Sequence, residues 1–305
     1  MHLVWAPLGT GPLGRFVESY VGHEAGVDHR LVVVYNGFGP GDDLGRWEHV
    51  LEGVAYEAVR LRAPVLDLDA YSEAVQRVPA ECFCFLNSYS VLLADGWLRS
   101  LIDAASQAGV GLAGASGSWA SRSSHMRFGM RLGGPYAGLL GDPADSGRMF
   151  RALATPGERR AGLASRISTA IEVPRTLAGF PSFPAHHLRT NGFVVRREVW
   201  KAIVGEGTRV RSKLDAHLLE SGRRSLSRRA EAASLAVAVV GRDGRVYPHP
   251  QWAASNTFWR GGQENLLIAD NQTEAYARAD EATRAALSRY AWGDAACSPT
   301  GTANA

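Results

Sequence analysis

Three ionisable side chains stand close together in the last third of the sequence, at Asp215, His217 and Glu220. If this segment is helical, His217 and Glu220 are three positions apart and share a face, whereas Asp215 and Glu220 diverge somewhat. A carboxylate placed in this way can accept a proton as a general base. We therefore take these three residues as the candidate catalytic group. The alternative is an ordinary solvated helix face.

Several polar residues follow short apolar segments that are typical of buried strands, such as Leu31–Tyr35 and Cys82–Leu86. Because ligands bind beyond the carboxyl ends of parallel strands, we expect a binding site in the residues that come after these strands and their neighbours. The candidates are Pro7, Gly9, Asn36, Asp67, Asn87, Ser88 and Tyr89. For Asn36 and Asp67, turn formation is the alternative.

Strand patterns alternate with helical patterns along much of the chain. The predicted strands are Leu3–Ala6, Leu31–Tyr35, Ala55–Leu61, Cys82–Leu86, Val110–Ala115, Leu188–Arg196 and Leu235–Val240. The predicted helices are Arg15–His23, Leu44–Gly53, Leu68–Val75, Asp95–Ala108, Gly147–Leu153, Glu158–Ile171, Arg197–Val204 and Lys213–Ala233. This alternation predicts an α/β fold with a mixed, mostly parallel sheet that is flanked by helices.

The composition excludes several classes of protein. With 46% hydrophobic and 21% charged residues, the chain is neither disordered nor fibrous. Its net charge of +3 is weak, so no nucleic-acid partner is expected. Cys82 and Cys84 share a strand face and cannot easily pair, which fits a reducing compartment. No signal peptide and no long apolar segment is visible, so we expect a cytoplasmic protein.

Several segments together resemble glycosyltransferases with the GT-A fold that are similar to glycosyltransferase family 2. Phe85–Ser90 resembles their strand and Asp-x-Asp turn, while Asp95–Leu98 and Gly109–Ala115 resemble the helix and strand that follow. Arg189–Glu198 is similar to the strand before the acceptor helix of those enzymes, and Leu214–Gly222 is similar to that helix.

The resemblance, which covers roughly residues 3–246, implies a GT-A-like (Rossmann-like) fold and a definite activity. It implies transfer of a sugar from a nucleotide-sugar donor to a saccharide or lipid-linked acceptor, in surface polysaccharide or glycoconjugate synthesis. The donor would sit at the strand ends, and the acceptor near Asn191 and Gly192. In inverting members a single carboxylate takes the acceptor proton, and Glu220 or Asp215 fits that role.

We expect a single catalytic domain over residues 1–291. Within it, residues 116–184 are rich in Gly, Ser and Arg, and they form either a flap or an acceptor-binding insertion. Residues 292–305 have the composition of a disordered tail.

The turn Asn87–Ser88–Tyr89 departs from the family in one respect. The family's Asp-x-Asp carboxylates hold Mn²⁺ or Mg²⁺ against the donor diphosphate, and this turn has no carboxylate. Tyr89 and His249 remain as candidate metal ligands, because a histidine near that place completes the metal shell in some members. The alternative is a metal-independent enzyme in which cations and backbone N–H groups offset the diphosphate charge.

Four arginines recur at helical spacing at Arg223, Arg224, Arg228 and Arg229. Such a group can bind a diphosphate, or it can hold the protein at the inner face of a membrane by peripheral contact with anionic lipid. The alternative is a solvated helix face.

Two other functions are compatible with the same fold. One is a non-catalytic nucleotide- or sugar-binding protein that lacks the metal carboxylates. The other is a sugar-phosphate nucleotidyltransferase. That enzyme would need a basic glycine-rich opening loop with a lysine nearby, and Gly9–Gly14 is followed only by Arg15.

Overall fold

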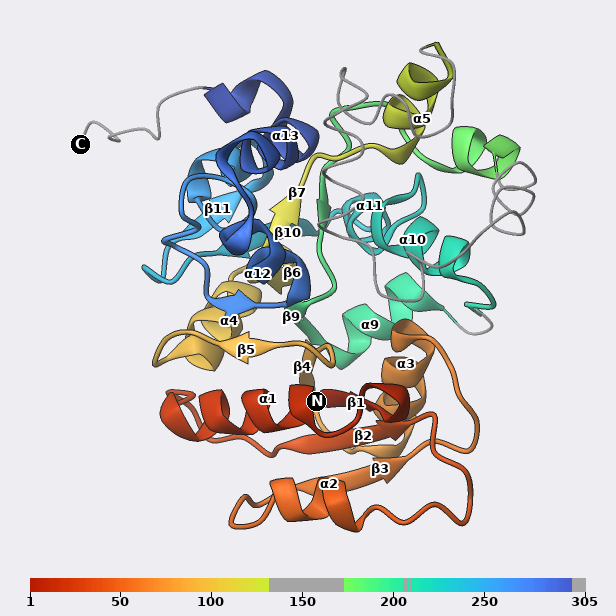
Figure 1. Cartoon of the computed structure of the whole chain (residues 1–305), viewed down its shortest axis with the longest axis vertical. Helices are drawn as coiled ribbons and strands as arrows, with labels where there is room; N and C mark the ends of the chain where they lie inside the picture. The colour runs from red at the N-terminus through yellow and green to blue at the C-terminus, as the bar shows by residue number, and fades with distance from the viewer. Residues whose placement is uncertain (132–172, 206–207, 209, 298–305) are drawn as a thin grey trace.

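A computed structural model of the chain describes residues 1–131, 173–205, 208 and 210–297 (Figure 1). Its centre is an eight-stranded mixed sheet with the strand order β11-β10-β6-β9-β4-β1-β2-β3. The strands are β1 (His2–Trp5), β2 (Val32–Asn36), β3 (Glu57–Arg60), β4 (Cys82–Leu86), β6 (Val110–Gly114), β9 (Gly192–Arg196), β10 (Ala236–Val240) and β11 (Val246–Pro248). Only β9 and β11 run against the others. The predicted α/β class is confirmed.

Helices cover both faces of this sheet. One face packs against α1 (Gly11–Gly22), α2 (Gly45–Val50) and α4 (Trp97–Ser106). The other packs against α3 (Asp67–Arg77), α9 (Arg197–Val204), α10 (Lys213–Ser221), α11 (Leu226–Ala232) and α13 (Glu281–Trp292).

The two hydrophobic cores follow from the alternation of side chains along each strand. In β2, Val32 and Val34 belong to one core, whereas Val33 and Tyr35 belong to the other. Both sets are apolar because both faces of the sheet are covered. These uninterrupted apolar runs are what made the strands recognisable in the sequence.

The direction in which strands are added reverses between β1 and β4. The chain runs outward through β1, β2 and β3, and then returns to place β4 on the other side of β1. In an open α/β sheet such a reversal leaves a crevice beyond the carboxyl ends of the two strands, where ligands bind. Residues after β1 and β4 therefore face the expected site.

Three predicted elements differ from the structure. Gly11–Gly14 form the first turn of α1 and not an open loop. The predicted helix Lys213–Ala233 is two helices, α10 and α11. The chain turns at Gly222, and a Cβ there would lie 2.4 Å from the carbonyl oxygen of Leu218, so the turn requires glycine. The predicted strand Leu188–Arg196 begins only at Gly192.

The segment 116–184 is partly described. It contains β7 (Gly117–Ser118), which pairs with β8 (His187–Leu188), then α5 (Arg122–Arg131) and a helical stretch over residues 173–179. The helices predicted at Gly147–Leu153 and Glu158–Ile171 lie outside the described residues, so the flap or insertion remains a prediction.

The carboxyl-terminal part adds a short strand pair and two helices. Short strands β5 (Val91–Leu92) and β12 (Ile268–Ala269) pair with each other, and α12 (Asn271–Arg278) leads into α13. A 3-10 helix continues over Gly293–Cys297, so the described structure extends past the predicted start of the tail at residue 292. Residues 298–305 lie outside the described residues. No helix in the described part is long and apolar enough to cross a membrane.

His2 is a buried polar residue with no polar partner. It lies in β1 with 0% exposure, and its ring stacks on Phe16 at 3.7 Å between centroids. Neither ring nitrogen has a hydrogen-bond partner within the described residues. Burial therefore lowers the pKa of His2 to about 3.

This burial predicts an acid-sensitive fold. Between pH 6.5 and 3 the unfolded chain takes up a proton at His2 that the folded protein excludes, so stability is lost as the pH falls. We expect the free energy of unfolding of the wild type to drop by about 2 kcal/mol more than that of His2→Phe between pH 7 and pH 5, measured by urea titration. His49→Gln, which changes an exposed histidine, should retain the wild-type slope. Equal slopes for the wild type and His2→Phe would contradict the prediction.

Candidate functional site

The turn after β4 is held by its own first residue. The side-chain carbonyl of Asn87 accepts hydrogen bonds from the backbone N–H of Tyr89 at 2.9 Å and from the hydroxyl of Ser90 at 3.3 Å. Ser88 is buried, whereas Tyr89 is half-buried. The amide of Asn87 thus shapes the turn as Asn commonly does, and Tyr89 is presented at the end of the strand.

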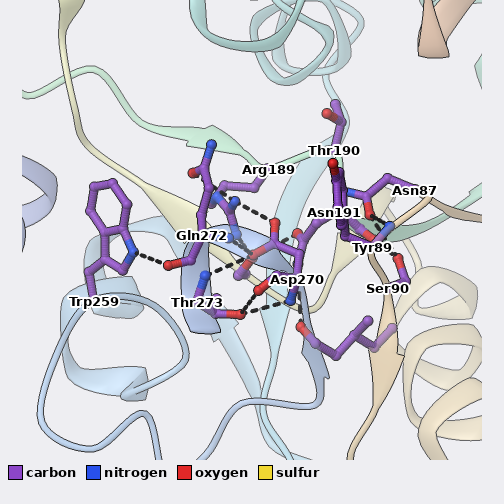
Figure 2. A network of polar contacts seen from close by, with 12 residues as sticks. Asn87, Tyr89, Ser90, Arg189, Thr190, Asn191, Trp259, Asp270, Gln272 and Thr273 are labelled. Carbon is purple, nitrogen blue, oxygen red and sulfur yellow. Dashed lines mark hydrogen bonds and ion pairs between the residues drawn. The ribbon is translucent and has the colours of Figure 1, made fainter. Parts of the chain in front are cut away.

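Asn191 joins three segments at this edge of the sheet (Figure 2). Its backbone carbonyl accepts a 2.7 Å hydrogen bond from Ser90, and its side-chain carbonyl accepts a 2.9 Å bond from Ser116. Its amide nitrogen donates to the backbone carbonyl of Ile268 at 3.3 Å. Asn191 is therefore a buried connection between the turn after β4, the end of β6 and β12.

Asn191 and Gly192, the predicted acceptor-binding residues, are both engaged within the protein. Asn191 is 1% exposed, and its side chain is already bonded. At Gly192 a Cβ would lie 2.8 Å from the Cδ1 atom of Ile268, so close packing requires the glycine. Both residues hold neighbouring segments together, and their contact with an acceptor stays a prediction.

A buried ion pair underlies the same edge (Figure 2). The guanidinium of Arg189 donates to the carboxylate of Asp270 at 2.7 Å, to Gln272 at 2.9 Å and to Ser116 at 3.3 Å. It also lies 4.1 Å from the ring centre of Phe258. Both partners of the pair are almost fully buried. Sequence patterns did not reveal Arg189 as a site residue, because its partners come from distant segments.

Asp270 has a second function, as the N-terminal cap of α12. Its carboxylate accepts the backbone N–H groups of Gln272 and Thr273 at 3.1 and 2.9 Å, while the hydroxyl of Thr273 accepts the backbone N–H of Asp270 at 2.8 Å. This reciprocal capping arrangement holds the carboxylate in the orientation in which it pairs with Arg189.

Glu220 is anchored to the residue that lies between Arg189 and Asn191. One carboxylate oxygen accepts hydrogen bonds from the backbone N–H and the hydroxyl of Thr190, at 3.2 and 3.3 Å. The other oxygen lies 3.9 Å from Nδ1 of His217. The predicted pairing of His217 with Glu220 on one face of a helix is therefore present. Because the two neighbours of Thr190 are buried and bonded, the position of Glu220 is fixed by the network below it.

Asp67 shares an electrostatic environment with Glu220, although the two lie on different helices. Asp67 begins α3 and is reached by solvent. Desolvation by the surrounding protein and the negative charge of Glu220 together raise the pKa of Asp67 to about 6. Burial and the charge of Asp67 likewise raise the pKa of Tyr89. These three residues, with Thr190 and His217, are called the strand-end cluster below.

The two carboxylates of the strand-end cluster differ in acidity. Burial acts to raise the pKa of Glu220, but the neighbouring imidazole of His217 and the charges of His187 and Arg189 outweigh it and lower the pKa to about 2. Burial lowers the pKa of His217. At neutral pH Glu220 is therefore an anion beside a neutral imidazole, and Asp67 is the more basic carboxylate.

Asn36 and Asp215 both make hydrogen bonds within the protein. The amide of Asn36 is 0% exposed and bonds the backbone of Val65 twice, at 2.7 and 3.1 Å, which fixes the loop that leads to Asp67. Asp215 accepts hydrogen bonds from Ser212 and Arg175 at 2.9 and 2.7 Å in the first turn of α10. Asn36 thus fixes the loop that leads to Asp67, and Asp215 stabilises a helix start; their predicted roles in donor binding and catalysis stay predictions.

Pro7 and Gly9 lie directly beyond β1, as expected. Pro7 belongs to a 3-10 helix over Ala6–Leu8, and Gly9 follows with a φ of 66°, in the region that favours glycine. The carbonyl of Gly9 accepts a hydrogen bond from the indole of Trp47 at 3.3 Å. Their role in donor binding stays a prediction.

Tyr89 and His249 do not come together to bind a metal. His249 follows β11, and its ring stacks on that of His186 at 3.8 Å. Three strands separate β11 from β4 in the sheet, which corresponds to roughly 19 Å. In the described part of the chain no three His, Cys, Asp or Glu side chains converge to hold a metal. Tyr89 and His249 therefore do not meet at one metal site in the described structure, and a divalent metal stays a prediction.

The four clustered arginines do not form a single face. Arg228 lies 3.4 Å from Glu231, and Arg229 donates to the backbone carbonyls of Ile203 and Val204 at the end of α9. Arg223 and Arg224 are exposed. The group is therefore two structural arginines and two that face solvent.

No family model matches the chain, and no curated protein matches it significantly. Among solved structures, it is similar to the mannosyltransferase PcManGT from Pyrobaculum calidifontis in complex with GDP-Man and Mn²⁺. The identity is 14% over 97% of this chain and 72% of that chain, with a TM-score of 0.40. This similarity is too distant to assign a function, so the function proposed below depends on the residues of this chain.

The buried ion pair predicts a large effect of a small substitution. Asp270→Asn retains an oxygen for the helix cap but leaves Arg189 without a counter-charge. We expect it to lower the free energy of unfolding by about 3 kcal/mol in urea titration. The matched control is Glu274→Gln in the same helix, which removes the surface pairs with Arg15 and Arg278 and should cost less than about 1 kcal/mol. Equal effects of the two substitutions would contradict the assignment.

A second prediction concerns the link between the carboxylates. In Glu220→Gln the neighbouring negative charge is gone, so the pKa of Asp67 should fall below its wild-type value of about 6. Carboxyl NMR titration measures this directly. Glu231→Gln, which removes a carboxylate on α11, should leave the titration of Asp67 unchanged. If Asp67 titrated identically in Glu220→Gln and the wild type, the two residues would not share a site.

Proposed function

We propose that this protein is a glycosyltransferase that moves a sugar from a nucleotide-sugar donor to a saccharide or lipid-linked acceptor. The reaction takes place at the strand-end cluster, beyond the carboxyl ends of β1 and β4. The donor nucleotide lies on the Asp67 and Tyr89 side, and the acceptor hydroxyl approaches Glu220. The subtype is the GT-A-like arrangement that the sequence resemblance implies.

One observation carries the proposal. Asp67, expected on the donor side, and Glu220, expected as the proton acceptor, lie far apart in the sequence. The negative charge of Glu220 contributes, after desolvation, to the raised pKa of Asp67, which supports assigning both residues to one site. That site is at the edge of the sheet where α/β proteins bind ligands. Carboxylates whose environments separate their pKa values are typical of catalytic centres.

The proposed reaction transfers one proton to the protein and releases one leaving group, the nucleoside diphosphate. The acceptor hydroxyl oxygen forms a bond to the anomeric carbon of the donor sugar, and its proton passes to the carboxylate of Glu220. The bond from that carbon to the diphosphate oxygen breaks, and the nucleoside diphosphate leaves with the electron pair. The hydrogen bonds from Thr190 hold the accepting carboxylate in a fixed orientation.

The leaving diphosphate needs positive charge, and Arg122 is in a position to supply it. Arg122 is exposed at the start of α5, and its charge acts on His217 and on Tyr290. Within the described residues no carboxylate pairs with it. A guanidinium can bind two phosphate oxygens at once, so Arg122 is the candidate for stabilising the leaving group.

The structure bears differently on the two alternative functions, a nucleotidyltransferase and a non-catalytic binding protein. Arg15, the cation beside the glycine-rich segment, is paired with Glu274, and Gly11–Gly14 are helical; neither feature supports a nucleotidyltransferase. A non-catalytic sugar-nucleotide-binding protein is favoured by the missing carboxylates in Asn87–Ser88–Tyr89. Product formation with a bound donor and EDTA present would exclude that rival and would establish transfer without a divalent ion.

Donor binding tests the first half of the proposal. We expect one of a panel of UDP-, GDP- and dTDP-sugars to bind in isothermal titration calorimetry, and Asp67→Asn to weaken that binding. Absence of binding by every member of the panel would overturn the donor assignment.

Substitution of Glu220 tests the second half. Glu220→Gln keeps the shape of the side chain but cannot accept a proton, so turnover should fall by about 100-fold or more while the donor affinity changes by less than about threefold. Glu198→Gln, at a side chain that is 78% exposed on α9, should retain full activity. An undiminished rate in Glu220→Gln would mean that another group takes the proton.

A further inference from the structure

A cavity of about 380 Å³ lies beside α10 and α11, apart from the strand-end cluster. Figure 1 shows these helices next to α9. Its walls are mostly apolar, with Val210, Leu218 and Leu219 among them, and Ala178 and Gly179 complete one side. Three arginines, Arg223, Arg224 and Arg229, line the same cavity, with Asp215 as the acidic residue of the lining.

The positive charge in this cavity is not neutralised from within. Asp215 is already paired with Arg175, at 2.7 Å. Arg223 donates to the backbone carbonyl of Ala178, and neither Arg223 nor Arg224 has a carboxylate partner within the described residues. Burial and the adjacent charge of Arg224 lower the pKa of Arg229, which indicates that the two guanidinium groups repel each other. An anion placed between them would relieve this repulsion.

The helix α10 separates this cavity from the strand-end cluster. Asp215, Leu218 and Leu219 line the cavity, at the spacing of one helix face. His217 and Glu220 interact instead with each other and with Thr190. The cavity is therefore a second site on the opposite side of the helix that carries the proposed proton acceptor.

We propose that this cavity binds the phosphate group of an amphipathic ligand, with the phosphate held by Arg223, Arg224 and Arg229 and an apolar chain against Val210 and Leu218. Arginines at the opening and aliphatic walls together select a ligand that has both a phosphate and a hydrocarbon part. A lipid-linked acceptor has this chemistry, so the inference deepens the proposed function and rests on it for its biological meaning. Binding itself requires no transfer activity.

The test uses calorimetric binding of three probes to the full chain without any donor: octyl phosphate, inorganic phosphate and octyl glucoside. Octyl phosphate should bind at least about tenfold more tightly than either of the others, because each of those lacks one of the two recognised parts. Arg224→Gln should weaken octyl phosphate binding by about tenfold or more. This side chain has no described hydrogen bond that folding would lose.

The matched control is Arg228→Gln, which removes a neighbouring arginine that pairs with Glu231 and does not line the cavity. Its affinity for octyl phosphate should stay within about twofold of the wild type. Equal binding of octyl phosphate and inorganic phosphate would overturn the proposal in favour of a small anion. An unchanged affinity in Arg224→Gln, or no binding of octyl phosphate, would also overturn it. None of these outcomes bears on nucleotide-sugar binding, so this inference and the proposed function can fail separately.

Discussion

The ion pair between Arg189 and Asp270 is the interaction on which the functional edge of the sheet depends. A guanidinium in the protein interior is tolerated only when a counter-charge and hydrogen-bond acceptors surround it, and Asp270, Gln272 and Ser116 supply them. Once Arg189 is fixed, the next two residues have little freedom. Thr190 then bonds Glu220, and Asn191 bonds Ser90 in the turn after β4. One buried pair thus orders groups from four separate segments.

The strand-end cluster combines two carboxylates in unlike surroundings. Glu220 is stabilised as an anion by its hydrogen-bond donors, whereas Asp67 is held beside that anion with little compensation. Such a separation of pKa values is typical of catalytic sites, where carboxylates with unlike surroundings have different roles. In the proposed reaction, the first carboxylate receives the acceptor proton and the second recognises the donor.

Much of the fold was predictable from the sequence, and less of the site. The apolar runs Leu31–Tyr35 and Cys82–Leu86 are strands because both faces of the sheet are covered, and such runs need no knowledge of their partners. The pairing of His217 with Glu220 was predictable because it is local to one helix. The bonds of Asn36 to Val65 and of Arg189 to Asp270 were not, because they depend on which loops meet in three dimensions. The break at Gly222, where the backbone becomes extended, is likewise not visible in the apolar periodicity.

The reversed direction of β9 changes where site residues are found in the sequence. In a parallel strand the functional edge is reached on leaving the strand, as at Asn87 after β4. Because β9 runs against β4 and β6, that edge is reached on entering the strand, and Arg189, Thr190 and Asn191 precede it. Whether a site residue comes before or after its strand in the sequence thus depends on the direction of that strand in the sheet. A prediction that considers only the residues after each strand therefore misses Arg189, Thr190 and Asn191, which precede β9.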